Sequence, residues 1–244
     1  MKFRTGVFAF LWITAFVPVG CGGAGSVDSA GGGAADLTTT GGDIRAPEGS
    51  GPGASGTSCA TGDPNQICLA LKYVVYADSA GNEVVSRDIA LKNVVAINKI
   101  WSPCRIAFQI DEYIAVLPKD FGLLFNPANS IEMIGIRRSQ VDDATLLVVT
   151  TGTWNRDGSL GATGANAWTS MPEEGPYGVV LERPVGDFSN IIAHELGHYL
   201  NLGHMDDAND LMNPVIYNAS TQLTALQCEK ARLAAGTYWQ RMLR

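Results

Sequence analysis

The residues best suited to chemistry are the three histidines of this 244-residue chain, which all lie within eleven positions, at His194, His198 and His204. Histidine is the commonest protein ligand for metal ions, and Glu195 directly follows the first of the three. Side chains four residues apart leave a helix on the same face, so His194 and His198 can share one ion if this segment is helical. The spacing therefore predicts a hydrolytic zinc site.

The third histidine needs a turn in the chain. Six residues of continuing helix would rotate His204 by roughly 240° from His198 and carry it about 9 Å along the axis. We therefore expect the chain to turn back after Leu200. Asn201 suits this turn, because the left-handed residue at a helix C-terminus is usually Gly and sometimes Asn, and Gly203 would ease the approach to His204. Three protein ligands leave a fourth position for water, which is typical of catalytic zinc.

Glu195 is the candidate catalytic residue. One position along from a metal ligand, it can take a proton from the attacking water and pass it to the leaving amine, as general base and then acid. Zinc would lower the pKa of the water and polarise the carbonyl group under attack. A helix with incidental surface histidines is the alternative, and four specified residues at this spacing make it a poor one.

The segment resembles the metzincin zinc metallopeptidases, whose signature is H-E-x-x-H-x-x-G-x-x-H followed by a methionine-containing turn. This chain has Asn201 in place of the signature glycine, and Asp210-Leu211-Met212-Asn213-Pro214 looks like the Met-turn. The resemblance implies that Met212 packs under the metal site and does not bind the ion. It also implies an α/β (α+β) fold: a metzincin-like catalytic domain with a twisted mixed β-sheet, long helices, the zinc helix at the cleft floor and a small C-terminal helical subdomain.

In that family an antiparallel edge strand lines the cleft, and an edge offers backbone groups to an extended peptide. We expect substrate binding at Gly164, Ala165, Asn166, Ala167 and Trp168, with a glycine-rich surface loop as the alternative. Tyr217 could reach the cleft, although packing or pocket-wall duty is the other interpretation. Structural calcium at Asp142, Asp143 and Asp157 is a further expectation, set against the usual case that scattered acids are only solvated.

The N-terminus has the features of an export signal. A basic start at Lys2 and Arg4 precedes an apolar run, residues 7–19, that is too short to span a membrane. The run ends near Cys21 and resembles a bacterial lipoprotein signal, in which Cys21 is lipidated; ordinary cleavage and release is the alternative. We therefore expect a signal peptide over 1–20, a flexible Gly/Ser-rich tether over 21–57 and a zinc metallopeptidase domain over 58–244. A latency propeptide is the other interpretation of the middle segment.

Four more cysteines fit an exported domain. An even number favours two disulfides, for which we expect Cys59–Cys68 and Cys104–Cys228, against the alternative of buried free thiols. The net charge of −7, without a basic patch, argues against a nucleic-acid partner. We expect a monomer whose membrane contact is limited to the lipid anchor at Cys21.

Hydrophobic periodicity predicts the elements that must position these residues. Strands are expected over 69–76, 105–117, 145–151 and 177–182. Helices are expected over 87–100, 130–140 and 220–243, with the zinc helix beginning after Asp187 as its N-cap.

Taken together, these features predict an exported, zinc-dependent endopeptidase that acts on proteins or peptides and is either lipid-anchored at the bacterial cell envelope or secreted. Two alternatives stay open: a surface-tethered binding protein on an inactive metzincin scaffold, and a zinc amidase that acts on cell-wall peptides. The intact Glu195 argues against the inactive scaffold.

Overall fold

The computed structural model describes residues 58–59, 63–160 and 163–244. The expected signal peptide, the tether and Cys21 lie outside the described residues. Within the described part of the chain, no helix is long and apolar enough to cross a membrane.

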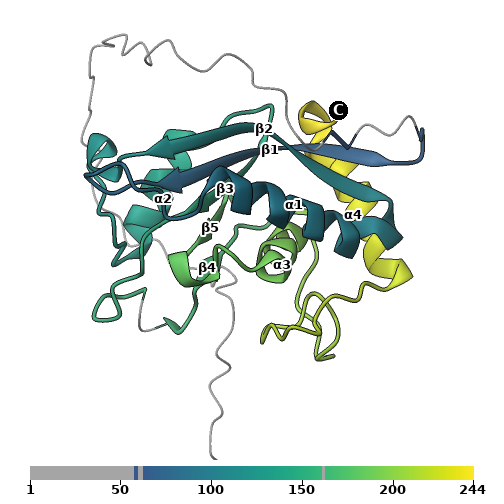
Figure 1. The fold of residues 1–244 in the computed structure, drawn as a ribbon. Coiled ribbons are helices and arrows are strands. Elements are labelled where there is room, and N and C mark those ends of the chain that lie inside the picture. The colour runs from purple at the N-terminus through teal and green to yellow at the C-terminus, as the bar shows by residue number, and fades with distance from the viewer. Residues whose placement is uncertain (1–57, 60–62, 161–162) are drawn as a thin grey trace, which may run out of the picture.

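One five-stranded mixed sheet organises the domain, in the order β2-β1-β3-β5-β4 (Figure 1). Four strands run parallel: β1 (Ile67–Tyr76), β2 (Ile106–Val116), β3 (Leu146–Thr150) and β5 (Val179–Leu181). The fifth, β4 (Ala167–Trp168), pairs antiparallel with β5 and forms one edge. Every residue of β3 and β5 is buried, as expected for short apolar strands in the interior of a parallel sheet.

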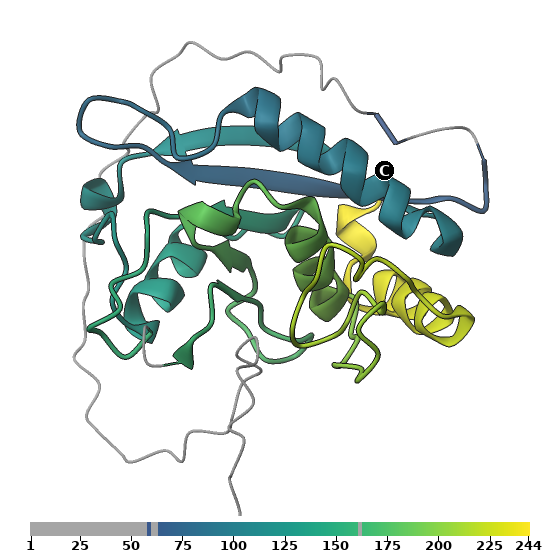
Figure 2. The same cartoon turned by 60° about the horizontal axis from the view of Figure 1, so that its bottom comes forward.

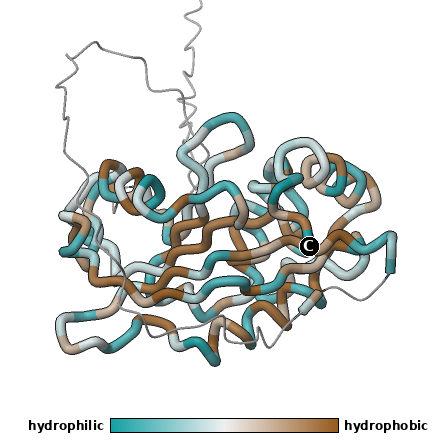
Figure 3. The backbone as a smooth tube through the Cα atoms, turned by 90° about the horizontal axis from the view of Figure 1, so that it is seen from above, coloured by the Kyte–Doolittle hydropathy of each residue, from teal (hydrophilic) through white to brown (hydrophobic). Residues whose placement is uncertain are grey.

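Helices cover both faces of this sheet. The helix α1 (Arg87–Trp101) lies on one side, and α2 (Ser130–Gln140) lies on the other (Figures 2 and 3). Ser86 caps α1 by accepting a hydrogen bond from the backbone N–H of Ile89. The buried face of α1 packs against α3 (Ser189–Tyr199), which carries the histidines. In this way the sheet and α1 hold the histidine-bearing helix from one side.

The last helix is shorter than the 220–243 expected. It spans Ala225–Tyr238 (α4), because Thr224 and Gln227 form a reciprocal capping box that fixes its first turn. It ends before Trp239, whose indole N–H donates to the carbonyl of Tyr199 at 2.8 Å. The N-cap of α3 also differs from the expectation: Phe188, and not Asp187, takes that position, and it makes no side-chain capping bond.

Two disulfides are present in the structure. Cys104–Cys228 joins α4 to the turn that follows α1, and Cys59–Cys68 joins the start of the described chain to β1. Both pairs are those favoured by the sequence.

Candidate metal centre

The helix α3 brings two of the three histidines and the glutamate together. His194, Glu195 and His198 are all buried, as is every residue of the helix from Ile192 to Tyr199. The backbone N–H of Leu200 still bonds to the carbonyl of Leu196, and the helical pattern stops there.

The chain then reverses through a left-handed residue. Asn201 has φ = +63°, and its N–H donates to the carbonyl of His198 at 2.9 Å, while the N–H of Leu202 donates to the carbonyl of Gly197 at 2.9 Å. This pair of bonds is the Schellman arrangement that ends many helices. Gly203 does not have a positive φ, and a Cβ added there would meet nothing within 4 Å, so neither the backbone conformation nor a close contact requires glycine at this position.

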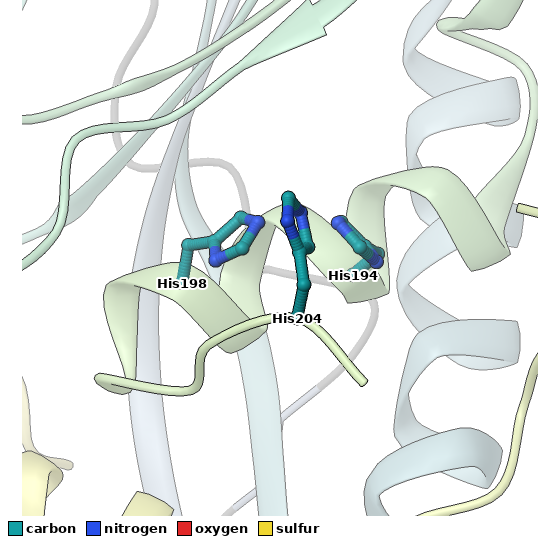
Figure 4. Close-up of side chains that lie close together, drawn as sticks. All are labelled: His194, His198 and His204. Atoms are coloured by element: carbon teal, nitrogen blue, oxygen red, sulfur yellow. The ribbon is translucent and has the colours of Figure 1, made fainter. Parts of the chain in front are cut away.

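This reversal brings His204 over α3. The metal-binding nitrogens of His194, His198 and His204 lie within 4.8 Å of one another, with two rings rising from successive turns of the helix and the third from the loop (Figure 4). The hydrogen bonds and the burial of the rings fit a zinc site.

Hydrogen bonds fix which ring nitrogen of each helical histidine faces the site. Carbonyls only accept, so the Nδ1–H of His194 donates to Leu211 O at 2.7 Å, and the Nδ1–H of His198 donates to Leu202 O at 2.9 Å. The Nε2 lone pairs are then left for a metal. The Nε2 of His194 is fully buried and has no protein partner, which is costly unless a ligand occupies it.

Burial also keeps the site in its metal-binding protonation state. It lowers the pKa of His194 to about 4, and partial desolvation followed by the neighbouring His198 lowers the pKa of His204. Zinc binds neutral imidazole, so these two rings do not have to lose a proton first at neutral pH. Three nitrogen ligands on a partly open site fit a zinc ion that keeps one position for water.

The carboxylate of Glu195 lies buried beside this cluster. Its Oε2 accepts a hydrogen bond from the hydroxyl of Thr169 at 2.6 Å, and Thr169 is itself buried directly after β4. Thr169 was not predicted as a site residue from the sequence, because no motif joins it to the H-E-x-x-H segment.

Met212 is fully buried and lies beneath the three histidines. A Cβ added at Gly197 would overlap with its sulfur, so the methionine sits directly against the backbone of α3 between the two helical histidines. Its own N–H donates to Asp210 Oδ1 at 2.7 Å, and Gln227 Nε2 donates to the same oxygen at 2.8 Å. Asp210, the first residue of the predicted Met-turn, and Gln227 thus tie this turn to the first turn of α4, a contact that was not predicted from the sequence.

The expected substrate-binding residues lie at and before the edge strand. Ala167 and Trp168 form β4, while Gly164 is exposed with φ = +69° and Ala165 is buried. Asn166 accepts from the N–H of Glu182 through its carbonyl. Arg156 holds the segment before β4 in place, because it donates to the carbonyl of Ala165 and pairs with the buried carboxylate of Glu182.

The remaining candidates lie further out. Tyr217 is half exposed after the Met-turn, and its carbonyl accepts from the side chain of Asn190 near the start of α3. Asp142 is occupied by the N–H groups of Ala144 and Thr145 and pairs with Lys72, and Asp143 pairs with Arg241. Calcium at these acids stays a prediction.

Comparison with known proteins supports a metzincin-type fold for the domain. Residues 138–232 match the family model of the matrixins, which are metzincins, over less than half of the chain. The matched segment includes β4, α3, the Met-turn and most of α4. The domain is metzincin-type. Matrixins are zinc-dependent, and the described residues of this chain carry three histidines that could hold a metal ion.

The metzincin-type fold is also that of a solved structure. Metalloproteinase-II from Bacteroides fragilis aligns with a TM-score of 0.50 at 13% identity, over 70% of this chain and 53% of that one. The chain thus spans about half the length of that protein, and the likeness shows the fold alone. No curated protein matches the sequence.

Proposed function

We propose that the protein is an exported zinc endopeptidase in which His194, His198 and His204 hold the metal and Glu195 moves the proton. The observation that carries this proposal is the cluster of three convergent imidazoles with a buried carboxylate beside it, on a metzincin-type scaffold. Zinc, when bound, would acidify the attacking water and polarise the peptide carbonyl. Glu195 would accept the proton of that water and return it to the leaving amine.

The edge strand β4 would align the substrate. The N–H of Glu182 bonds to the carbonyl of Asn166, and Trp168 faces Val180 in the antiparallel ladder, so the alternation turns the backbone groups of Ala167 away from β5. An extended peptide could pair with them as an additional strand. This mode recognises the backbone, which suits a substrate that is a protein or peptide.

Features at different places in the chain support the proposal that the enzyme is exported. The N-terminal pattern of residues 1–20 has the form of a signal peptide, and two disulfides are typical of an oxidising compartment. We propose lipidation at Cys21 as the anchor, with a flexible tether over 21–57.

The test compares wild type, Glu195→Ala and the exposed control Glu229→Ala, each loaded with zinc, on casein and on purified peptidoglycan. We expect casein cleavage by wild type and the control, loss of at least about a thousandfold in Glu195→Ala, and equal zinc content in all three. Chelation should abolish wild-type activity, and added zinc should restore it.

Each alternative predicts a different result. Release of peptides from peptidoglycan without casein cleavage would indicate a cell-wall amidase. Equal turnover in wild type and Glu195→Ala would exclude the hydrolytic role of Glu195. Zinc bound without turnover on either substrate would favour a binding protein on an inactive scaffold.

A further inference from the structure

The contact between Thr169 and Glu195 is a short hydrogen bond between two buried side chains. Thr169 Oγ1 lies 2.6 Å from Glu195 Oε2, and the two residues come from the end of the edge strand and from the metal-binding helix. A hydroxyl that donates to a carboxylate makes a charge-assisted bond, which is stronger than a neutral one. The bond therefore links the substrate-binding edge directly to the proposed general base.

The bond is relevant to catalysis because the carboxylate of a glutamate can rotate about its terminal torsion. The terminal torsion of glutamate has broad minima, so a carboxylate without a fixed donor samples a wide range of orientations. General-base catalysis requires hydrogen-bond reach and alignment to the proton that is taken. A donor fixed on Oε2 narrows this range of orientations.

Thr169 is in turn fixed by its neighbours. Successive side chains of an extended segment point to opposite sides. Thr169 therefore faces Glu195, while the side chains of Trp168 and Ser170 point to the opposite side of the segment. The guanidinium of Arg137, on α2, donates to the carbonyl of Trp168 at 3.1 Å and to the hydroxyl of Ser170 at 3.1 Å. The hydroxyl of Ser170 donates onward to the carbonyl of Pro176 at 3.1 Å.

Arg137 is an unusual residue for a merely structural bond. It is 3% exposed, and no carboxylate lies within ion-pair distance of it among the described residues. Burial lowers the pKa of Arg137 to about 10, and the charges of Tyr199 and Glu195 act against that shift. A planar guanidinium holds two points at once in a fixed geometry, which a lysine cannot do. Here the two bonded groups, the carbonyl of Trp168 and the hydroxyl of Ser170, belong to the residues on either side of Thr169.

We propose that Thr169 is a positioning residue for Glu195, and that Arg137 holds Thr169 in place by bonding to the residues on either side of it. The inference rests on the proposed peptidase function for its kinetic consequences only. The contact itself exists independently of any substrate.

The kinetic test uses Thr169→Val, which keeps the shape and removes the donor, and Thr169→Ser, which keeps the donor. Thr145→Val is the matched control, because Thr145 is a buried threonine whose hydroxyl donates to the Asp142 carboxylate at 2.9 Å, in the loop between α2 and β3. In Thr169→Val we expect kcat to fall about 10–100-fold with KM within about 2-fold and zinc content unchanged. Thr169→Ser and Thr145→Val should stay within about 3-fold of wild type.

Arg137→Lys tests the second part of the proposal, since it keeps the charge and loses the fork. We expect a fall in kcat smaller than that of Thr169→Val, with zinc retained. Wild-type kcat in Arg137→Lys would overturn the supporting role of the arginine and leave that of Thr169 standing.

A second readout does not depend on turnover. In the metal-free protein, the shifts in Tm caused by Thr169→Val and Glu195→Ala should not add in the double variant, because both remove the same bond. Additive shifts, or equal losses of kcat in Thr169→Val and Thr145→Val, would overturn the proposal. If wild type cleaves no peptide at all, the proposed function fails, and the Tm comparison still decides whether Thr169 positions Glu195.

Discussion

At the scale of single residues, the backbone of Asn201 determines where His204 can go. Its positive φ reverses the chain, and the same turn places the carbonyl of Leu202 where His198 Nδ1 can donate to it. One backbone conformation therefore serves two of the three proposed ligands. A residue that resists the left-handed region should affect metal binding without changing a ligand.

We expect Asn201→Val to weaken zinc binding about tenfold. A β-branched residue in the left-handed region costs roughly 1–2 kcal/mol, and relief of that strain would move His204 and Leu202 together. Titration of zinc against a competing chelator measures the effect, with Asn201→Gly as the control that should bind like wild type. Unchanged affinity in Asn201→Val would refute the role of the turn.

Gly197 is the second residue whose identity is set by a close approach. An added methyl group would overlap with the sulfur of Met212, so Gly197→Ala should destabilise the metal-free protein by about 1–3 kcal/mol in urea unfolding. Gly203→Ala, where the space is open, should change stability by less than about 0.5 kcal/mol. Equal effects of the two substitutions would show that Met212 does not pack tightly under the helix.

The site residues that could be predicted are those close together in sequence. His194, His198, His204 and Glu195 follow one helical pattern and one turn, so local geometry was sufficient. Thr169 is 26 residues from Glu195, and Asp210 is 17 residues from Gln227. Only the tertiary fold brings these pairs together, and no spacing rule could have identified them.

At the scale of elements, prediction followed the strength of the apolar pattern. The strands β1 and β2 and the helices α1 and α2 were expected close to their observed bounds. The helical spacing in α1 and the alternation in β2 are clear patterns, β1 was predicted from its β-rich composition, and α2 carried the weaker pattern. The strand β4 has two residues and no period, and it was located only through the family resemblance. The start of α4 was misplaced although Thr224 and Gln227 carry the spacing of a capping box.

The two disulfides close loops of very different size, with sequence separations of 124 for Cys104–Cys228 and 9 for Cys59–Cys68. Chain-entropy estimates give about 5 kcal/mol for the longer loop and about 2.5 kcal/mol for the shorter one. We therefore expect the Cys104→Ala/Cys228→Ala variant to lose more stability in urea unfolding than Cys59→Ala/Cys68→Ala. The reverse order would mean that the longer link does not hold α4 on the domain.

At the scale of the whole molecule, buried tyrosines should make the fold sensitive to alkali. Burial raises the pKa of Tyr73 to about 12 and also raises that of Tyr76, while both would titrate near 10 in the unfolded chain. At a pH between the unfolded and the folded pKa, these tyrosines lose their protons in the unfolded chain but keep them in the folded protein. The free energy of unfolding therefore falls as the pH rises above about 10.

The loss from Tyr73 alone should reach about 2–3 kcal/mol near pH 12. Urea unfolding midpoints measured from pH 8 to pH 11 test the onset, and Tyr73→Phe should make the decline shallower. A midpoint that stays constant across this range would contradict the burial of these hydroxyls.

We propose that one buried site both holds zinc and cleaves internal peptide bonds through Glu195. The most direct measurement is a mass-spectrometric cleavage profile of a peptide library, taken in parallel for wild type and Glu195→Gln, with zinc quantified in the same samples. We predict cuts at internal bonds by wild type, one zinc per chain in both proteins, and a loss of at least about a thousandfold in the variant. The same cleavage by both proteins, or cleavage by a zinc-free wild type, would contradict the account.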